Sequence, residues 1–94
     1  MDVILTLYIA GHTARSRDAV KSMRRIVSMV GEGVNLSVVD VLDSPGLAER
    51  ERIVATPMVV RESPEPVLRL VGDLTAWERV MRELELKEEE DSNE

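Results

Sequence analysis

The chain has 94 residues, of which 44% are hydrophobic, so it can form one domain with a modest core but not two. It contains no cysteine, which excludes disulfides, thiol catalysis and thiolate metal sites, and no apolar run long enough to span a membrane. The formal net charge is −6, but residues 87–94 hold five of the 18 acids and one of the 12 basic residues, which leaves 13 acids and 11 bases for residues 1–86.

This charge distribution predicts a single domain over residues 1–86 and an acidic, disordered tail over residues 87–94. The N-terminal sequence has no basic segment before its apolar run, so that run predicts a strand rather than a signal peptide. We therefore expect a cytoplasmic protein.

The first half of the chain is predicted to form a strand, a helix and a second strand. Residues 3–10 are almost continuously apolar, which is typical of a strand that is central in its sheet. Apolar residues recur at helical spacing over 19–30, with Ser16 as the expected N-cap and Asp18 in the first turn. Residues 34–41 alternate between apolar and polar, as in a half-exposed or edge strand. A strand–helix–strand unit predicts two parallel strands with a right-handed crossover.

The second half is predicted to begin with a short helix and a hairpin. The helix covers residues 47–53 and follows a turn built from Asp, Ser, Pro and Gly. Strands are expected at 57–61 and 67–71, joined by a connection with two prolines. Thr75 and Glu78 match a capping box, which would start a last helix whose apolar stripe includes Trp77.

The predicted order is βαβαββα, an α/β domain in which helices cover a four-stranded mixed sheet. This order, with Pro57 opening the third strand, resembles the thioredoxin fold. By itself Pro57 fits either an ordinary strand boundary or a cis-proline that shapes a site. The resemblance favours the cis form, because the matching residue in that fold is a cis-proline beside the active-site loop.

The residues predict no catalytic or metal site. Thioredoxin-like enzymes carry their cysteine pair after the first strand, where this chain has residues 11–16, GHTARS, and no thiol. His12 is the only histidine and lacks the partners that a general base or a metal site needs. We expect no enzymatic activity and no cofactor.

Five basic residues between Arg15 and Arg25 favour a solvated helix face, with a docking face for an acidic partner as the second interpretation. A phosphate- or nucleic-acid-binding face is a weaker alternative, because the domain is not net basic and aromatic residues make up only 2% of the chain. The predicted edge strand offers a second docking surface, unless its polar residues guard it.

Four blocks together resemble the KaiB family of circadian clock proteins. They are LTLYIAGHT at 5–13, VVDVLDSPGLAE at 38–49, VATP at 54–57 and VGDLTAWERV at 71–80. They occur in the family's order and at nearly its spacing, over residues 4–84. Two departures are a shortening by one residue before the second strand and Trp77, where the family usually has a charged residue.

The resemblance implies a non-enzymatic adaptor that binds a KaiC-type ATPase, modulates its phosphorylation cycle and competes with a histidine kinase whose sensor domain is similar to KaiB. A KaiA-like protein or the histidine kinase is a further candidate partner; no nucleic acid and no membrane are implied. The family is metamorphic, with a thioredoxin-like state and a state in which the second half is rearranged and commonly tetrameric. We expect the thioredoxin-like state and a monomer. The alternative is a thioredoxin-like interaction module in non-circadian signalling or stress response.

The resemblance also implies site residues. Residues 43–52 would form the helix that faces the ATPase, with Gly46, Leu47, Ala48 and Arg52 as contacts. Leu36, Ser37 and Val38 would form the edge for a second partner. Gly72 and Asp73 would lie at the junction where the two folds differ, and Pro57 would be cis in the thioredoxin-like state.

Overall fold

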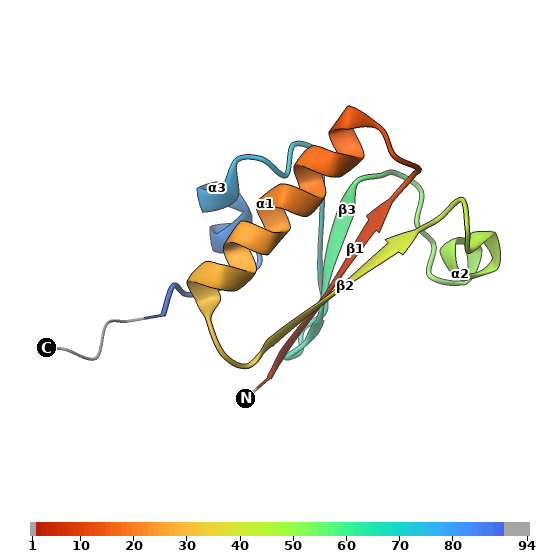
Figure 1. The fold of residues 1–94 in the computed structure, drawn as a ribbon. Coiled ribbons are helices and arrows are strands. Elements are labelled where there is room, and N and C mark those ends of the chain that lie inside the picture. The colour runs from red at the N-terminus through yellow and green to blue at the C-terminus, as the bar shows by residue number, and fades with distance from the viewer. Residues whose placement is uncertain (1, 90–94) are drawn as a thin grey trace, which may run out of the picture.

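The computed structural model describes residues 2–89, and its central feature is one mixed sheet in the order β2-β1-β3-β4 (Figure 1). The elements in chain order are β1 (Val3–Ile9), α1 (Ala14–Val30), β2 (Val34–Asp40), α2 (Pro45–Arg50), β3 (Met58–Ser63), β4 (Leu68–Val71) and α3 (Trp77–Glu83). The predicted order βαβαββα is confirmed. None of the helices described is long and apolar enough to cross a membrane.

Strand β1 is central, as its apolar run predicts, and β2 lies at one edge of the sheet. β1 and β2 are parallel, with Leu5 opposite Leu36 and Leu7 opposite Val38, whereas β3 runs antiparallel to both β1 and β4. The order strand–helix–strand and the parallel pairing predicted for the first half are therefore confirmed. Because partners across a ladder point to the same face, Leu36 and Val38 share the face of Leu5 and Leu7.

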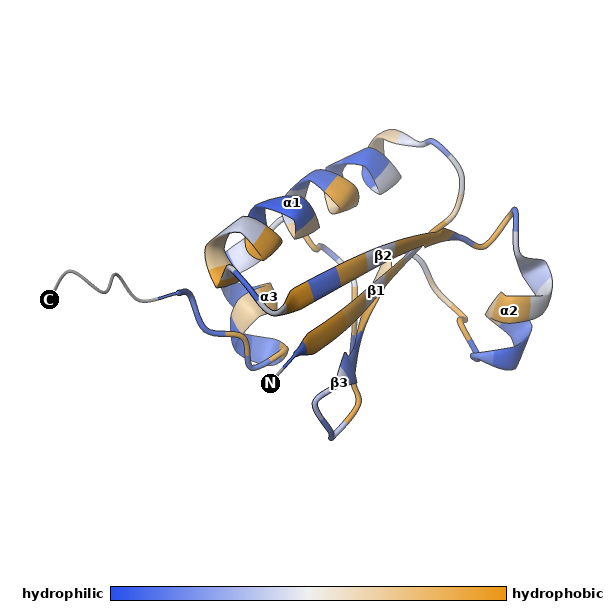
Figure 2. Ribbon diagram, turned by 60° about the horizontal axis from the view of Figure 1, so that its bottom comes forward, coloured by the Kyte–Doolittle hydropathy of each residue, from blue (hydrophilic) through white to orange (hydrophobic). Residues whose placement is uncertain are grey.

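Helices α1 and α3 cover that face, and α2 stands apart at one end of the sheet (Figures 1 and 2). The main core lies between these two helices and the sheet, and Trp77 packs against it, half-buried, as its place in the predicted stripe indicates. The fully buried large side chains include Leu5, Leu7, Met23, Ile26, Val59, Leu74, Val80 and Leu84. A smaller cluster on the opposite face contains Tyr8, Met58 and Val60, with Ile53 packed against it.

The predicted start of α1 is wrong by one turn. Thr13 is the N-cap, and its Oγ1 accepts a hydrogen bond from the Ser16 N–H at 3.1 Å, so Ser16 lies inside the helix. Asp18 consequently falls beyond the first turn. Both hydroxyl residues satisfy the local capping pattern, and the turn at Gly11, with φ 73°, lets the helix begin at the earlier one.

The predicted capping box of α3 is also wrong. The N-cap is Ala76, with no side-chain cap, and Glu78 does not reach back. Instead the Asp73 carboxylate accepts hydrogen bonds from the Thr75 hydroxyl and from the Thr75 N–H, the latter at 2.9 Å. Thr75 therefore closes a turn with Asp73, and the helix takes the next residue, Ala76, as its N-cap.

Helix α2 begins and ends earlier than the predicted 47–53, because Pro45 suits the first helical position and Arg52 has a left-handed φ of 57° that ends the helix. The strands predicted at 57–61 and 67–71 run over 58–63 and 68–71. The peptide bond before Pro57 is cis. Of the predicted tail, residues 87–89 are exposed, and residues 90–94 lie outside the described residues.

Candidate functional site

The open edge of β2 presents unpaired backbone groups in a definite pattern. The carbonyl of Gly33 accepts from the Val3 N–H at 2.6 Å, and the Val41 N–H donates to the Ile9 carbonyl at 2.8 Å. In a parallel ladder, the backbone N–H and C=O groups of successive residues point alternately to the two sides of the strand. Those of every second residue from Gly33 to Val41 therefore face β1. The N–H and C=O groups of the intervening residues, among them Leu36 and Val38, therefore face outward.

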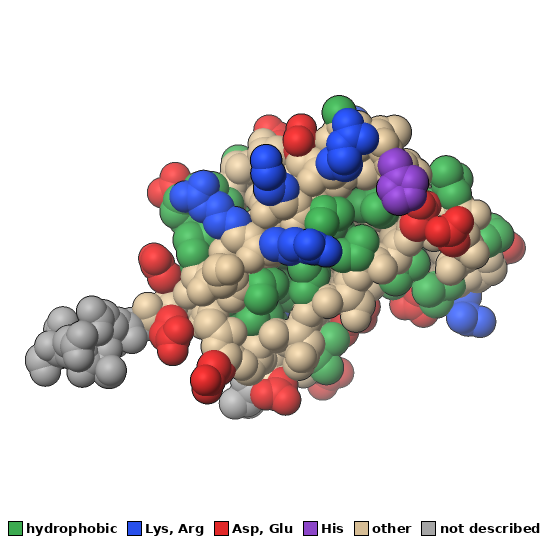
Figure 3. Space-filling view, viewed as in Figure 1, with side chains coloured by type: hydrophobic (Ala, Val, Ile, Leu, Met, Phe, Trp, Pro, Cys, Tyr) green, Lys and Arg blue, Asp and Glu red, His purple; other side chains and the backbone are tan. Residues whose placement is uncertain are grey.

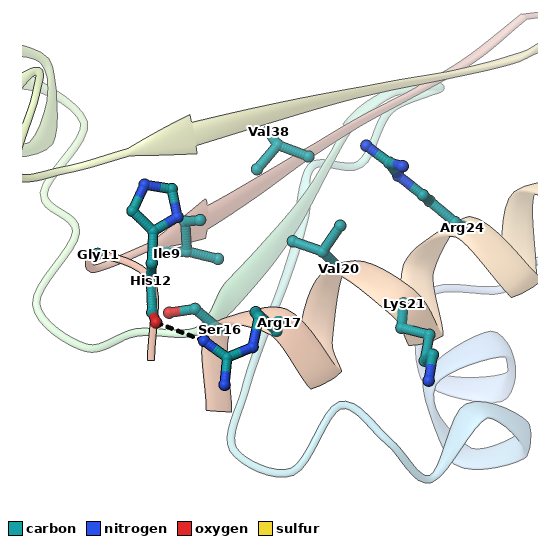
Figure 4. A pocket seen from close by; sticks show the side chains of 9 residues that line it. All are labelled: Ile9, Gly11, His12, Ser16, Arg17, Val20, Lys21, Arg24 and Val38. Carbon is teal, nitrogen blue, oxygen red and sulfur yellow. Dashed lines mark hydrogen bonds between the residues drawn. The ribbon is translucent and has the colours of Figure 1, made fainter. Parts of the chain in front are cut away.

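A groove of about 450 Å³ lies between this edge and α1 (Figure 4). Ile9, Val20 and Val38 form its apolar floor, and in Figure 4 the side chains of Val20 and Val38 point toward each other. The remaining lining residues are Gly11, His12, Ser16, Arg17, Lys21 and Arg24. The lining thus combines an apolar floor with a basic rim and contains no carboxylate.

The basic rim follows α1. Figure 3 shows Lys and Arg side chains above a hydrophobic stretch, with the histidine at one end. Arg17 Nη1 donates to the His12 carbonyl at 2.7 Å, so this arginine is partly held by the loop before α1. Arg25, outside the groove, lies with its guanidinium carbon 4.9 Å from the centroid of the Trp77 ring. Arg24 extends toward the strands, whereas Lys21 points away from them (Figure 4).

Asp40, the last residue of β2, holds Gly11, one of the residues that line the groove. Its Oδ1 accepts hydrogen bonds from the Gly11 N–H and the Leu42 N–H, both at 3.0 Å. These two backbone donors lower the pKa of the Asp40 carboxyl below its usual range, and the Gly11 N–H makes the larger contribution. The carboxylate therefore ties the loop before α1 to the end of β2.

Acid is expected to loosen this end of the groove. Because the folded-state pKa of Asp40 is lowered, its ionised form stabilises the fold above the unfolded-state pKa of about 4, and this contribution is lost as the pH falls through the folded-state value. Urea titrations between pH 7 and pH 3 should show a smaller fall in stability for Asp40→Asn than for the parent chain. Equal acid sensitivity of the two proteins would contradict the assignment.

The residues expected to face an ATPase lie on and after α2. None of the α2 side chains is buried: Gly46 is exposed, and Leu47 and Ala48 are half-buried. Arg52 is exposed but follows the helix rather than lying in it.

Two exposed apolar residues that the sequence did not indicate flank α2. Leu42 precedes the helix and is 68% exposed, and Val54 follows it and is 89% exposed. Both belong to the blocks that carry the family resemblance, but the sequence alone gives no measure of their exposure.

Pro57 lines a second cavity of about 410 Å³ together with Gly72 and Asp73, which follow it by 15 and 16 residues in the sequence. The other lining residues include Arg15, Asp18 and Thr75, so this cavity is more polar than the groove. The hydroxyl and N–H of Thr75 lower the pKa of Asp73. The structure thus brings the predicted junction residues together, and it separates them from α2 and from the β2 edge. Residues 2–89 contain no group of three or more His, Asp or Glu side chains that could hold a metal ion.

The family model for the KaiB domain matches residues 6–86. A circadian clock oscillator protein KaiB from Synechococcus sp. (strain RCC307) is 47% identical over 94 residues, which cover 96% of this chain and 86% of that protein. A second KaiB, from Nostoc punctiforme, is 46% identical over 88 residues, 93% of this chain and 85% of that protein.

Among solved structures, the N-terminal domain of Synechococcus elongatus SasA has a TM-score of 0.72 and 27% identity, and the match covers 97% of this chain and 90% of that domain. Mitochondrial thioredoxin 3 from Saccharomyces cerevisiae has a TM-score of 0.70 at 18% identity, over 86% of this chain and 77% of that one. The fold is therefore thioredoxin-like, as the element order predicts.

Proposed function

Because the chain belongs to the KaiB family of circadian clock proteins, we propose that it is a non-enzymatic clock adaptor in the cytoplasm, which binds a KaiC-type ATPase and modulates its phosphorylation cycle. The observation that carries this proposal is the surface around α2. A short helix that buries none of its side chains contributes little to the core, and the exposed apolar residues on both sides of it are available to a partner.

The ATPase-binding surface comprises Gly46, Leu47, Ala48 and Arg52, extended by Leu42 and Val54. The exposed apolar side chains would supply the buried centre of the interface. Arg50 and Arg52 are exposed beside them and could pair with carboxylates at its rim.

The similarity to the SasA domain supports the second part of the proposal, which is competition. Two domains with the same fold can present equivalent surfaces to one ATPase. The adaptor would then exclude the KaiB-like sensor domain of a histidine kinase from a shared site. The open edge of β2, at Leu36, Ser37 and Val38, would take a second partner, a KaiA-like protein or the kinase, by strand addition.

The cavity lined by Pro57, Gly72 and Asp73 bears on the proposed change of fold. A rearranged second half would have to open this cavity, because Pro57, which precedes β3, and the loop before α3 both line it. We place the resting protein in the thioredoxin-like state as a monomer. Backbone NMR assignment with measurement of the tumbling time checks both points, and a helix across residues 68–71 with tetramer tumbling would contradict them.

Val54→Asp is expected to weaken binding to a purified KaiC-type ATPase at least about tenfold, because a charge at the centre of an apolar interface must be desolvated without a partner. Val54 is 89% exposed, so the substitution should leave the fold intact. The matched control is Val67→Asp, at a valine that is 50% exposed in the connection between β3 and β4. Equal binding by both variants in calorimetric titrations would refute the α2 surface as the contact.

A further inference from the structure

We propose that the groove between α1 and β2 selects the second partner, which is an acidic peptide strand. In this complex an extended segment pairs along β2, inserts an apolar side chain opposite Val38, and places a carboxylate two residues away, near Arg24. The inference rests on the proposed adaptor function, because it specifies the chemistry of that function's second surface.

The geometry of β2 determines which side chains enter the groove. The outward N–H and C=O groups of Leu36 and Val38 are those that an added strand would pair with. The side chains of these two residues lie on the helix face of the sheet, and the directly opposite residues of an added strand point to the same face. Every second side chain of the partner therefore faces α1.

The apolar floor determines the central residue of the partner. Val38 is 40% exposed, and Val20 faces it across the groove. An aliphatic side chain inserted between them would remove apolar surface from water on both sides. A valine or isoleucine also suits an extended strand.

The basic rim determines which residue of the partner strand lies two positions from its central apolar residue. The lining contains three cationic side chains and no carboxylate, so a peptide carboxylate beside Arg24 would be attracted to the rim. Within residues 2–89, Arg24 takes part in neither of the two ion pairs, which are Arg61–Glu85 and Arg79–Glu83. Its planar guanidinium can bind a carboxylate in a bidentate manner.

Charge and ring placement disfavour two other occupants. A second copy paired through the same edge would bring two basic rims together, which like-charge repulsion opposes. A single-stranded nucleic acid needs exposed aromatic rings for stacking, but Tyr8 is 3% exposed and Arg25 lies over the Trp77 ring.

Two blocked heptapeptides of equal composition, TETVTET and TTEVETT, test this inference by NMR titration of the labelled full chain. Only TETVTET places valine and both glutamates on one face of a strand, whichever direction the strand runs. We expect it to shift the amide signals of Leu36, Val38 and Val20 and to bind at least about fivefold more tightly than TTEVETT. Equal affinities, shifts confined to other elements, or self-association through β2 would overturn the proposal.

Charge reversal supplies the second measurement. Arg24→Glu should abolish the preference for TETVTET and create one for the lysine peptide TKTVTKT, whereas Arg82→Glu, an exposed arginine on α3, should leave the preference unchanged. An Arg24→Glu protein that still prefers TETVTET would overturn the role of Arg24.

This outcome is separable from that of the adaptor proposal. Arg24→Glu should bind the ATPase as the parent chain does, since the α2 surface is distinct from the groove. A parent chain that binds the ATPase but shows no preference between the two peptides refutes the groove proposal alone. Failure to bind the ATPase with peptide selectivity intact refutes the adaptor proposal.

Discussion

Replacing Leu7 by alanine is expected to lower the free energy of unfolding by about 3 kcal/mol, within the range of roughly 2–5 kcal/mol found for buried leucines. Leu7 has no exposed surface and lies in the central strand, between Val38 of β2 and Val59 of β3. The cavity left by the lost methyl groups would open between three strands and α1. Because strands on both sides fix its backbone, the site cannot collapse freely.

Urea unfolding followed by circular dichroism measures this change. Leu42→Ala is the matched control, because Leu42 is 68% exposed and its truncation should cost no more than about 0.5 kcal/mol. If Leu7→Ala cost less than about 1 kcal/mol, the position of Leu7 in a tightly packed core would be wrong. The variant should also weaken peptide binding in the groove, because Leu7 supports Val38 from the adjacent strand.

Replacing Arg61 by methionine is expected to lower the free energy of unfolding by about 3 kcal/mol, because two hydrogen bonds from a charged donor are lost and their carbonyls are left behind. Arg61 is only 4% exposed, although it lies on β3. Its Nη1 donates to the Leu84 carbonyl at 3.0 Å and its Nη2 to the Pro66 carbonyl at 2.9 Å. One guanidinium thus joins β3, the hairpin connection and the end of α3.

Methionine keeps much of the aliphatic stem, so the change tests the hydrogen bonds more than the volume. Arg82→Met, at an exposed arginine of α3, is the control and should be nearly neutral. Hydrogen exchange should also speed up most at the end of α3, where the carbonyl cap is lost. A variant as stable as the parent chain would mean that the core accommodates an apolar side chain at this position equally well.

The nearby Glu85 adds little to the Arg61 contact. Its Oε1 lies 3.9 Å from Arg61 Nη1, and its side chain is 67% exposed. A solvated pair at this distance contributes roughly 0–1 kcal/mol. The two backbone carbonyls, rather than the ion pair, account for most of the expected effect.

The sequence alone determined the element order and the layers. Continuous apolarity at residues 3–10 implied a central strand, and the strand–helix–strand order implied parallel pairing of β1 with β2. These inferences hold because burial on one or both faces leaves a periodic pattern in the sequence. The family also followed from the sequence, through four blocks whose joint order and spacing are more specific than any one of them.

The sequence determined the positions of the helix ends less well, because several neighbouring residues can satisfy the same capping pattern. Thr13 and Ser16 both suit an N-cap, and the turn at Gly11 decides between them. Thr75 suits a capping box, but it closes a turn with Asp73, and the helix takes Ala76 as its N-cap. Both arrangements satisfy local rules, and the sequence pattern does not encode which of them the backbone adopts.

Only the tertiary structure decided the groove, the burial of Arg61 and the meeting of Pro57 with Gly72 and Asp73. The groove exists because Val20 of α1 faces Val38 of β2, and that depends on how the helix lies across the sheet. Arginine is a residue type that is usually exposed to solvent. Arg61 can be buried because its guanidinium donates hydrogen bonds to the carbonyls of Leu84 and Pro66. Periodicity fixes the face on which a residue lies, whereas contacts between distant segments arise only from packing.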